Sequence, residues 1–299
     1  MGLLTIFTAP KAFTNPHITT IQCNALQSWL HLGQEVEVLL YGREVGIAEV
    51  AAEFGVKHIP DVACTETGAP YINSMFDITR QFSDSPLLCI VNADILFLLD
   101  IILASKQLLN LTDRFLALGQ RWDLDVTEPL DFADNWEERL SLRTKKYGQL
   151  HLPLGSDYFI FPRNCFQETP GFAIGRSGWD NWMIYHAMQQ NLATVDVTPS
   201  VMIVHQNHDY SHLPGNKPPY HMEESNRNRE LAGGKSHLYL ILDMKQQLVN
   251  GQIRKPPFSL ARAIRYVELK LYPQEGNPRG WRRVLIRRLR RMRREIEPA

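Results

Sequence analysis

Short apolar runs alternate with segments of helical periodicity along the first hundred residues of the chain. The apolar runs predict buried strands over 3–7, 35–41, 56–59 and 87–91. Between them, apolar residues at helical spacing predict helices over 19–32, 46–54 and 71–82. Gly33 and Gly55 stand where two of these helices end. Strands that alternate with helices at this pitch predict an α/β fold, with a mainly parallel sheet flanked by helices.

The pattern is less regular in the second half of the chain. It predicts strands over 115–120, 158–161 and 201–204, helices over 131–147, 180–191 and 236–249, and a proline-bearing loop over 210–220. The apolar stretch 87–104 contains Asn92, Asp94 and Asp100, and each buried Asp costs roughly 2.5–3.5 kcal/mol in a membrane span. A buried strand followed by a helix therefore fits this stretch better. Two prolines at 256–257 mark a linker, so we expect a domain over 1–250 and an appended segment over 251–299.

The composition, with 44% hydrophobic and 21% charged residues among 299, is that of an ordinary globular protein. A net charge of zero hides an asymmetry, because nine Arg and two Glu follow residue 278, which gives this end about +7 and the rest about −7. Six apolar side chains of this end fall near one helical face: Trp281, Val284, Leu285, Leu289, Met292 and Ile296. A basic amphipathic helix with a Trp predicts a peripheral contact with an anionic membrane surface. A nucleic-acid arm and a solvated, frayed end are the alternatives.

Two further observations bear on where the protein acts and on its partners. The four cysteines lie far apart and form no CxxC pair, so we expect reduced thiols rather than disulfides or a zinc knuckle. The expected location is the cytoplasm, on the cytoplasmic face of the membrane. No interleaving of aromatic and basic residues occurs before the Arg-rich end, so a nucleic-acid partner is not expected. The sequence leaves the oligomeric state open.

The most informative motif is Asn92-Ala93-Asp94, which directly follows the apolar strand over 87–91. In open α/β sheets, ligands bind at the carboxyl ends of the strands. A carboxylate at that edge suits Mg²⁺ or Mn²⁺, which in turn holds a diphosphate. The alternative is that Asp94 only caps the next helix.

Placed after four alternating units, this motif resembles the Asp-x-Asp motif of GT-A-type glycosyltransferases, with Asn92 where the first Asp often stands. The resemblance covers about residues 3–250 and extends to Gly155-Ser156-Asp157-Tyr158, Gly178-Trp179-Asp180-Asn181 and His205-Gln206-Asn207-His208. It implies a GT-A-like domain that moves a sugar from a nucleotide-diphosphate donor to a hydroxyl of a glycan or lipid-linked acceptor, as in polysaccharide biosynthesis. It also implies Mn²⁺ or Mg²⁺ as the cofactor, although Asn92 leaves metal dependence open.

The resemblance further implies a role for individual residues. Asp180 would be the general base of an inverting reaction, or only the cap of the helix that it begins. Asp94 would bind the metal, and His205 and His208 are both candidates to complete its ligands; the alternative for each histidine is a structural role next to the site. Residues expected to contact the donor are Thr8, Pro10, Gly42, Asn73, Arg80, Asn92 and Asp94. Residues expected to contact the acceptor are Asp157, Tyr158 and Trp179, unless this segment is an ordinary edge strand with a turn.

Two other functions fit the same residues. A sugar-1-phosphate nucleotidyltransferase shares the sheet and the metal-binding Asp, but it needs a glycine-rich loop after the first strand, where this chain has Thr8-Ala9-Pro10-Lys11. A non-catalytic, membrane-recruited binding protein with a degenerate donor site is favoured by Asn92.

Overall fold

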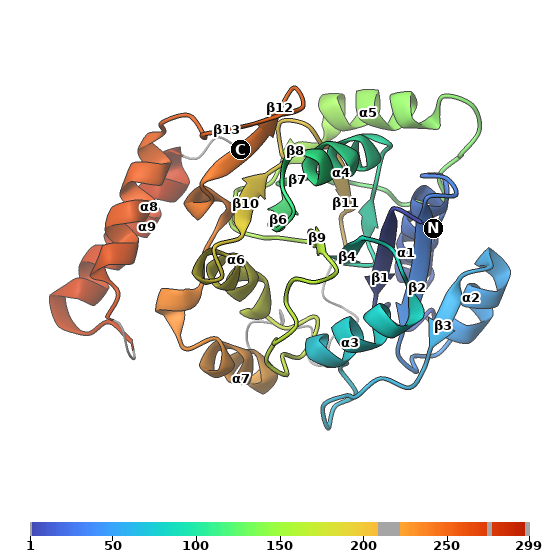
Figure 1. Cartoon of the computed structure of the whole chain (residues 1–299), viewed down its shortest axis with the longest axis horizontal. Helices are drawn as coiled ribbons and strands as arrows, with labels where there is room; N and C mark the ends of the chain where they lie inside the picture. The colour runs from blue at the N-terminus through green and yellow to red at the C-terminus, as the bar shows by residue number, and fades with distance from the viewer. Residues whose placement is uncertain (1, 209–221, 274–276, 297–299) are drawn as a thin grey trace.

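A nine-stranded sheet forms the centre of the molecule in the computed structural model, which describes residues 2–208, 222–273 and 277–296 (Figure 1). The strand order is β13-β12-β10-β6-β9-β4-β1-β2-β3. The strands are β1 (Leu4–Thr8), β2 (Val36–Tyr41), β3 (Lys57–Ile59), β4 (Leu87–Val91), β6 (Phe115–Leu118), β9 (Tyr158–Pro162), β10 (Ala193–Asp196), β12 (Gln246–Val249) and β13 (Gln252–Arg254). Only β9 and β13 run antiparallel to their neighbours. The predicted α/β fold with a mainly parallel sheet is confirmed.

Helices cover both faces of this sheet. Their bounds are α1 (Pro16–Leu30), α2 (Ile47–Phe54), α3 (Ile72–Phe82), α4 (Asp100–Leu111), α5 (Trp136–Tyr147), α6 (Trp179–Gln189), α7 (Glu223–Leu231), α8 (Leu260–Leu271) and α9 (Gly280–Ile296). Helices α1, α2 and α4 pack on one face, and α3 and α6 pack on the other. Alternate side chains of β4 enter the two cores, which is why the strand reads as a continuous apolar run.

A second, four-stranded sheet lies beside the first, in the order β5-β11-β7-β8. Its strands are β5 (Ile95–Leu96), β7 (Arg121–Leu124), β8 (Gln149–Leu150) and β11 (Ile203–Gln206). The strand predicted over 201–204 is β11, two residues further along. The other three strands have two or four residues each, too short for their periodicity to be recognised. This small sheet positions most of the candidate site described below.

The helix predicted over 236–249 is wrong. The segment holds two 3-10 turns, η3 (Lys235–His237) and η4 (Ile241–Asp243), followed by strand β12. Strand β12 pairs with β10 in the large sheet and continues into β13 through Asn250 and Gly251, both with positive φ. An Asn-Gly pair is a strong signal for a two-residue hairpin turn, and here that pairing prevails over the helical periodicity.

The last part of the chain forms a hairpin of α8 and α9, packed side by side (Figure 1). The helix expected over 281–296 is α9, whereas α8 was not anticipated. Strand β13 belongs to the large sheet although it lies beyond residue 250, the boundary expected from the sequence. Within the described residues, no helix is both long enough and apolar enough to cross a membrane. The loop expected over 210–220 lies outside the described residues.

Candidate active site

Asp94 lies between β4 and β5, at the carboxyl edge of the large sheet. Strand β11 pairs with β5 in antiparallel register, with His205 opposite Ile95. The backbone N–H of Gln206 donates to the Asp94 carbonyl oxygen at 3.2 Å, and the Gln206 side chain donates to the same oxygen. This pairing explains why two histidines more than a hundred residues further along the chain reach Asp94.

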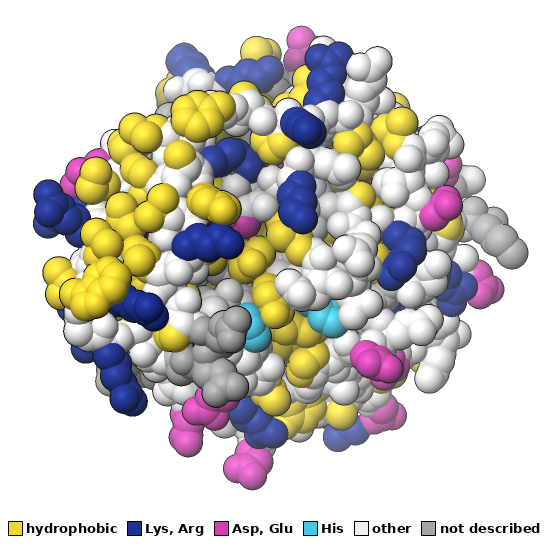
Figure 2. All heavy atoms as spheres, turned by 60° about the vertical axis from the view of Figure 1, so that its left-hand side comes forward, with side chains coloured by type: hydrophobic (Ala, Val, Ile, Leu, Met, Phe, Trp, Pro, Cys, Tyr) yellow, Lys and Arg dark blue, Asp and Glu magenta, His cyan; other side chains and the backbone are white. Residues whose placement is uncertain are grey.

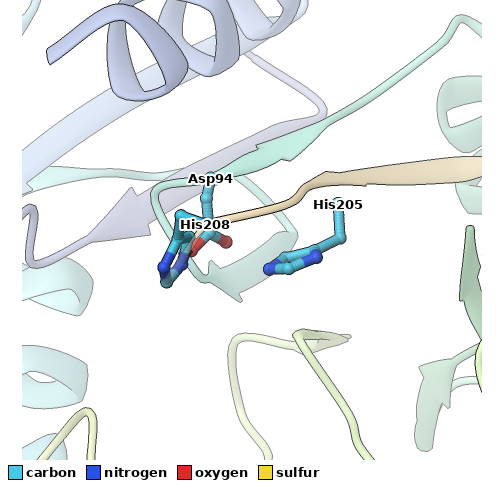
Figure 3. A group of neighbouring side chains, drawn as sticks. All are labelled: Asp94, His205 and His208. Carbon is cyan, nitrogen blue, oxygen red and sulfur yellow. Dashed lines mark hydrogen bonds and ion pairs between the residues drawn. The ribbon is translucent and has the colours of Figure 1, made fainter. Parts of the chain in front are cut away.

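The side chains of Asp94, His205 and His208 converge on one point (Figure 3). One potential ligand atom from each lies within 4.8 Å of the others. His208 Nε2 is 3.0 Å from Asp94 Oδ2, whereas Asp94 Oδ1 is buried and has no hydrogen-bond partner within the described part of the chain. A carboxylate with a free buried oxygen and two imidazoles fits a divalent transition-metal ion. Two nitrogen donors favour Mn²⁺ over Mg²⁺, which prefers oxygen ligands and keeps several waters.

Positive charge surrounds the carboxylate. Burial raises the pKa of Asp94, but the hydrogen bond from His208 and the charges of His205 and Lys11 outweigh that effect, so the pKa lies well below its usual range. Lys11 Nζ is 3.4 Å from His208 Nε2. Gln22 of α1 holds the Lys11 backbone by two hydrogen bonds, of 2.7 and 3.0 Å. Lys11 is thus fixed beside the group, where an ammonium can bind a phosphate.

A second carboxylate, that of Asp123, lies next to His205, on the side away from the other potential metal ligands. The small sheet aligns His205 of β11 with Asp123 of β7, and Asp123 with Gln149 of β8. Asp123 accepts hydrogen bonds from His205 Nδ1 at 3.1 Å and from His151 Nδ1 at 2.7 Å. A proton on His205 Nδ1 leaves Nε2 as the metal-binding atom, as in many carboxylate–histidine–metal arrangements. His151 follows β8 and is half-buried at the rim of the site.

Asn92 anchors the neighbouring strand. Its side-chain Nδ2 donates to Asp157 Oδ1 at 3.0 Å, and its backbone N–H donates to the Asp157 carbonyl oxygen at 2.8 Å. Arg121 donates to the same carboxylate oxygen at 2.6 Å and to Asp123 at 2.8 Å. Asp157 is buried, and both side-chain hydrogen bonds reach its Oδ1. Asn92 thus links the end of β4 to the start of β9 at the edge of the site.

Asp180 stands at the start of α6, which faces the same edge. Its Oδ1 accepts a hydrogen bond at 3.1 Å from the backbone N–H of Gly178, the residue just before α6, and no side chain of the described residues caps the first turn of this helix. Burial raises the pKa of Asp180, backbone N–H groups lower it, and the nearby charge of Asp157 raises it again. A carboxyl group with a raised pKa is better suited to accept a proton near neutral pH. The hydrogen bond from Gly178 and proton transfer are compatible, because a carboxylate has two oxygens.

Four residues expected to contact the donor lie at this edge. Thr8, Pro10 and Gly42 follow or end β1 and β2, which run parallel to β4. Asn73 lies in the first turn of α3, and its buried Oδ1 has no hydrogen-bond partner within the described residues. A base or ribose could supply the missing donor.

Three expected contacts are not brought into the site. Arg80 lies at the far end of α3, where it donates to the carbonyl oxygens of residues 163, 165 and 166. Tyr158 is fully buried in the large core, with its ring 5.6 Å from that of Phe97, because β9 is flanked by strands on both sides. Trp179 is also buried, against Phe159. Neither aromatic ring is open for stacking on a sugar.

The sequence alone did not single out Lys11, Asp123 or His151. Lys11 appeared there only as part of a loop without glycine. Asp123 and His151 belong to or follow strands of four and two residues, whose pairing with β11 is a tertiary effect. An isolated Asp and His in polar segments carry no signal of their own.

No family model matches the chain, and no curated protein matches its sequence. Solved structures do match. Glucosyl-3-phosphoglycerate synthase from Mycobacterium tuberculosis has 15% identity and a TM-score of 0.47, over 87% of this chain and 88% of that chain. The same enzyme in complex with Mn²⁺, UDP-glucose and phosphoglyceric acid has 14% identity and a TM-score of 0.45, with the same coverage. A mannosyltransferase from Pyrobaculum calidifontis in complex with GDP-Man and Mn²⁺ has 9% identity and a TM-score of 0.43, over 68% of this chain and 56% of that chain.

The chain is similar to these sugar transferases. With TM-scores below 0.5 and identities of 15% or less, the likeness says nothing about its activity.

Proposed function

We propose that this protein is a glycosyltransferase that moves a sugar from a nucleotide-diphosphate donor to a hydroxyl group of a glycan or lipid-linked acceptor. The observation that carries the proposal is the convergence of Asp94, His205 and His208 at the carboxyl edge of the parallel sheet. These residues would hold Mn²⁺, or less favourably Mg²⁺, and when bound the ion would neutralise charge on the diphosphate. Lys11 would bind the same phosphates from the other side.

The chain's own residues would perform the transfer by inversion. Asp180 accepts the proton of the acceptor hydroxyl while that oxygen attacks the anomeric carbon of the donor sugar. The bond from the anomeric carbon to the diphosphate oxygen breaks, and the diphosphate leaves with the electron pair. Asn92 and Arg121 hold Asp157 at the edge of the site, where its second oxygen could accept a hydrogen bond from the acceptor. Asn73 and the ends of β1 and β2 line the side on which the nucleoside would bind.

The first test is binding. We expect UDP or GDP with Mn²⁺ to raise the melting temperature, to do so less with Mg²⁺, and to lose the effect in Asp94→Ala. If no nucleoside diphosphate stabilises the protein under any of these conditions, the proposal fails and a non-catalytic protein is favoured.

The second test is catalysis with a donor found in that screen. Asp180→Asn should reduce turnover by about 10²- to 10⁴-fold, the usual contribution of a general base, while donor binding is retained. Asp77→Asn, an exposed carboxylate on α3, is the matched control and should keep full activity. Turnover of Asp180→Asn within a few fold of wild type would show that the base is wrongly assigned.

One observation favours a second function. Lys11 follows the first strand and lies beside Asp94, where a sugar-1-phosphate nucleotidyltransferase would need a cation for the triphosphate. That enzyme would release pyrophosphate from a nucleoside triphosphate and a sugar-1-phosphate. An assay for pyrophosphate with these substrates separates the two reactions, since the glycosyltransferase releases none.

A further inference from the structure

The C-terminal helix α9 packs on α8 through charged side chains. Glu268 of α8 is fully buried and pairs with Arg290 at 3.0 Å and Arg293 at 3.3 Å. Arg265 adds a third pair with Glu268 at 3.2 Å and ties the hairpin to Asp243 of η4 at 2.9 Å. This buried network fixes the orientation of α9 on the body of the protein.

Much of the apolar face of α9 is exposed. Trp281 is 66% exposed, Val284, Met292 and Ile296 are also exposed, and Leu285 and Leu289 are half-buried. An amphipathic helix of a globular protein ordinarily turns its apolar stripe to the core. Here the buried side chains of α9 are instead Ile286 and Arg293. Among the described residues, the apolar stripe is therefore only partly covered, and its most exposed members are Trp281 and Val284.

Helix α8 enlarges this open surface. Phe258, just before α8, is 87% exposed, and Leu260, Tyr266 and Val267 of α8 are exposed as well. Exposed arginines of α9 accompany them at positions 282, 283, 287, 288, 291 and 294. We call these apolar and basic side chains of α8 and α9 the hairpin surface. Figure 2 turns this side toward the viewer and shows yellow side chains gathered in the left half, with dark blue ones around and between them.

We propose that the hairpin surface binds the face of an anionic lipid bilayer, with the two helices lying in the membrane plane. A bilayer supplies both things the surface lacks: an apolar layer for Trp281, Val284 and their neighbours, and negative headgroups for the arginines. A nucleic acid offers phosphates but no apolar layer for the stripe. A second copy in a two-fold dimer would bring arginines against arginines, which is repulsive. The proposal goes beyond the proposed transferase activity and does not depend on it.

The direct experiment is sedimentation of the full chain with vesicles of phosphatidylcholine, with and without about a third of phosphatidylglycerol. We expect binding only to the anionic vesicles and loss of binding at high salt. Arg287→Gln/Arg288→Gln/Arg291→Gln should lower the partition coefficient by about fivefold for each arginine, or on the order of a hundredfold in all. The matched control is Arg143→Gln/Lys145→Gln/Lys146→Gln on α5, which removes three exposed charges from another helix and should bind like wild type.

Trp281 provides an optical readout that is independent of sedimentation. The other five tryptophans are buried or half-buried and Trp281 is exposed, so insertion of this face should shift the tryptophan emission to the blue. Trp281→Phe should remove that shift and retain most of the binding. A shift that persists in Trp281→Phe would contradict insertion of this face.

Three results would overturn the proposal. The first is equal binding of the α9 triple variant and wild type to anionic vesicles, or no binding by wild type. The second is tighter binding of wild type to duplex DNA than to vesicles at the same salt, with loss of DNA binding in the triple variant. The third is a dimer in analytical ultracentrifugation that Trp281→Glu converts to a monomer, which would assign the surface to a second copy of the chain.

Discussion

Asp123 offers the sharpest test of how the candidate metal site is built. Its two carboxylate oxygens accept from His205, from His151 and from Arg121, at 3.1, 2.7 and 2.8 Å. Burial raises the pKa of Asp123, but the hydrogen bonds from the two histidines outweigh it and keep the carboxylate ionised. Asp123→Asn keeps the shape and replaces one accepting oxygen by an NH₂ group that cannot accept. At least one of the two histidines then loses its partner or must change tautomer.

The expected effect is on metal affinity. Loss of the carboxylate that orients a metal-binding histidine typically weakens binding 10- to 100-fold, or by about 1.4–2.7 kcal/mol. Titration calorimetry of Mn²⁺ into the full chain at neutral pH measures this, with Asp94→Ala showing that the ion binds at this site. Asp125→Asn is the matched control, because that carboxylate is exposed, lies two residues further along and binds only Asn207 among the described side chains. If Asp123→Asn binds Mn²⁺ within about threefold of wild type, Asp123 does not orient His205.

Three further predictions concern other parts of the molecule. Glu268→Gln should lower the free energy of unfolding in urea by about 3–5 kcal/mol, because three arginines lose a buried partner, while the exposed Glu295→Gln should change it by less than about 0.5 kcal/mol. Burial raises the pKa of Asp100 to about 6, compared with roughly 3.9 in the unfolded chain. Between these two pH values the folded protein binds the proton more tightly than the unfolded chain does. The free energy of unfolding therefore falls as the pH rises from about 4 to 6, by on the order of 2–3 kcal/mol. In Asp100→Asn the side-chain oxygen can still accept from the Met202 N–H. This variant should have a larger free energy of unfolding than wild type at pH 7 and should lose that advantage as the pH approaches 4. A difference in free energy of unfolding between the two proteins that does not change with pH would contradict this. Lys11→Met should weaken binding of a nucleoside diphosphate about 10- to 100-fold in calorimetry, with Mn²⁺ affinity not reduced.

The alternating units of the first hundred residues could be predicted because each strand and helix is specified locally. Strand β4 and Asp94 after it are where the sequence indicates, since five buried residues in a row leave little choice of structure. Gly55 ends α2 in the left-handed conformation, as its position predicts. The grouping of Asp94 with His205 and His208 was expected only through the resemblance to glycosyltransferases, because nothing local brings residues so far apart into contact.

The remaining features of the site depend on pairing between distant short segments. Strand β7 is recognisable only once β11 lies beside it, and that register places Asp123 against His205. Burial is also a tertiary property. Tyr158 looked available for a sugar in the sequence, but a strand hydrogen-bonded on both sides between two helical layers has no open face.

Asn92 shows how such a contact changes the meaning of a motif. In the sequence it is a departure from two acidic residues and an argument for a degenerate donor site. In the structure its Nδ2 lies 3.0 Å from Asp157 Oδ1, so a carboxylate at position 92 would face another carboxylate at hydrogen-bond distance. Two carboxylates that close cannot both ionise readily, and Arg121 is already shared between Asp157 and Asp123. An amide satisfies Asp157 without adding charge. Asn92 and the intact group of Asp94, His205 and His208 are therefore compatible, and the missing acidic residue does not by itself argue against metal binding.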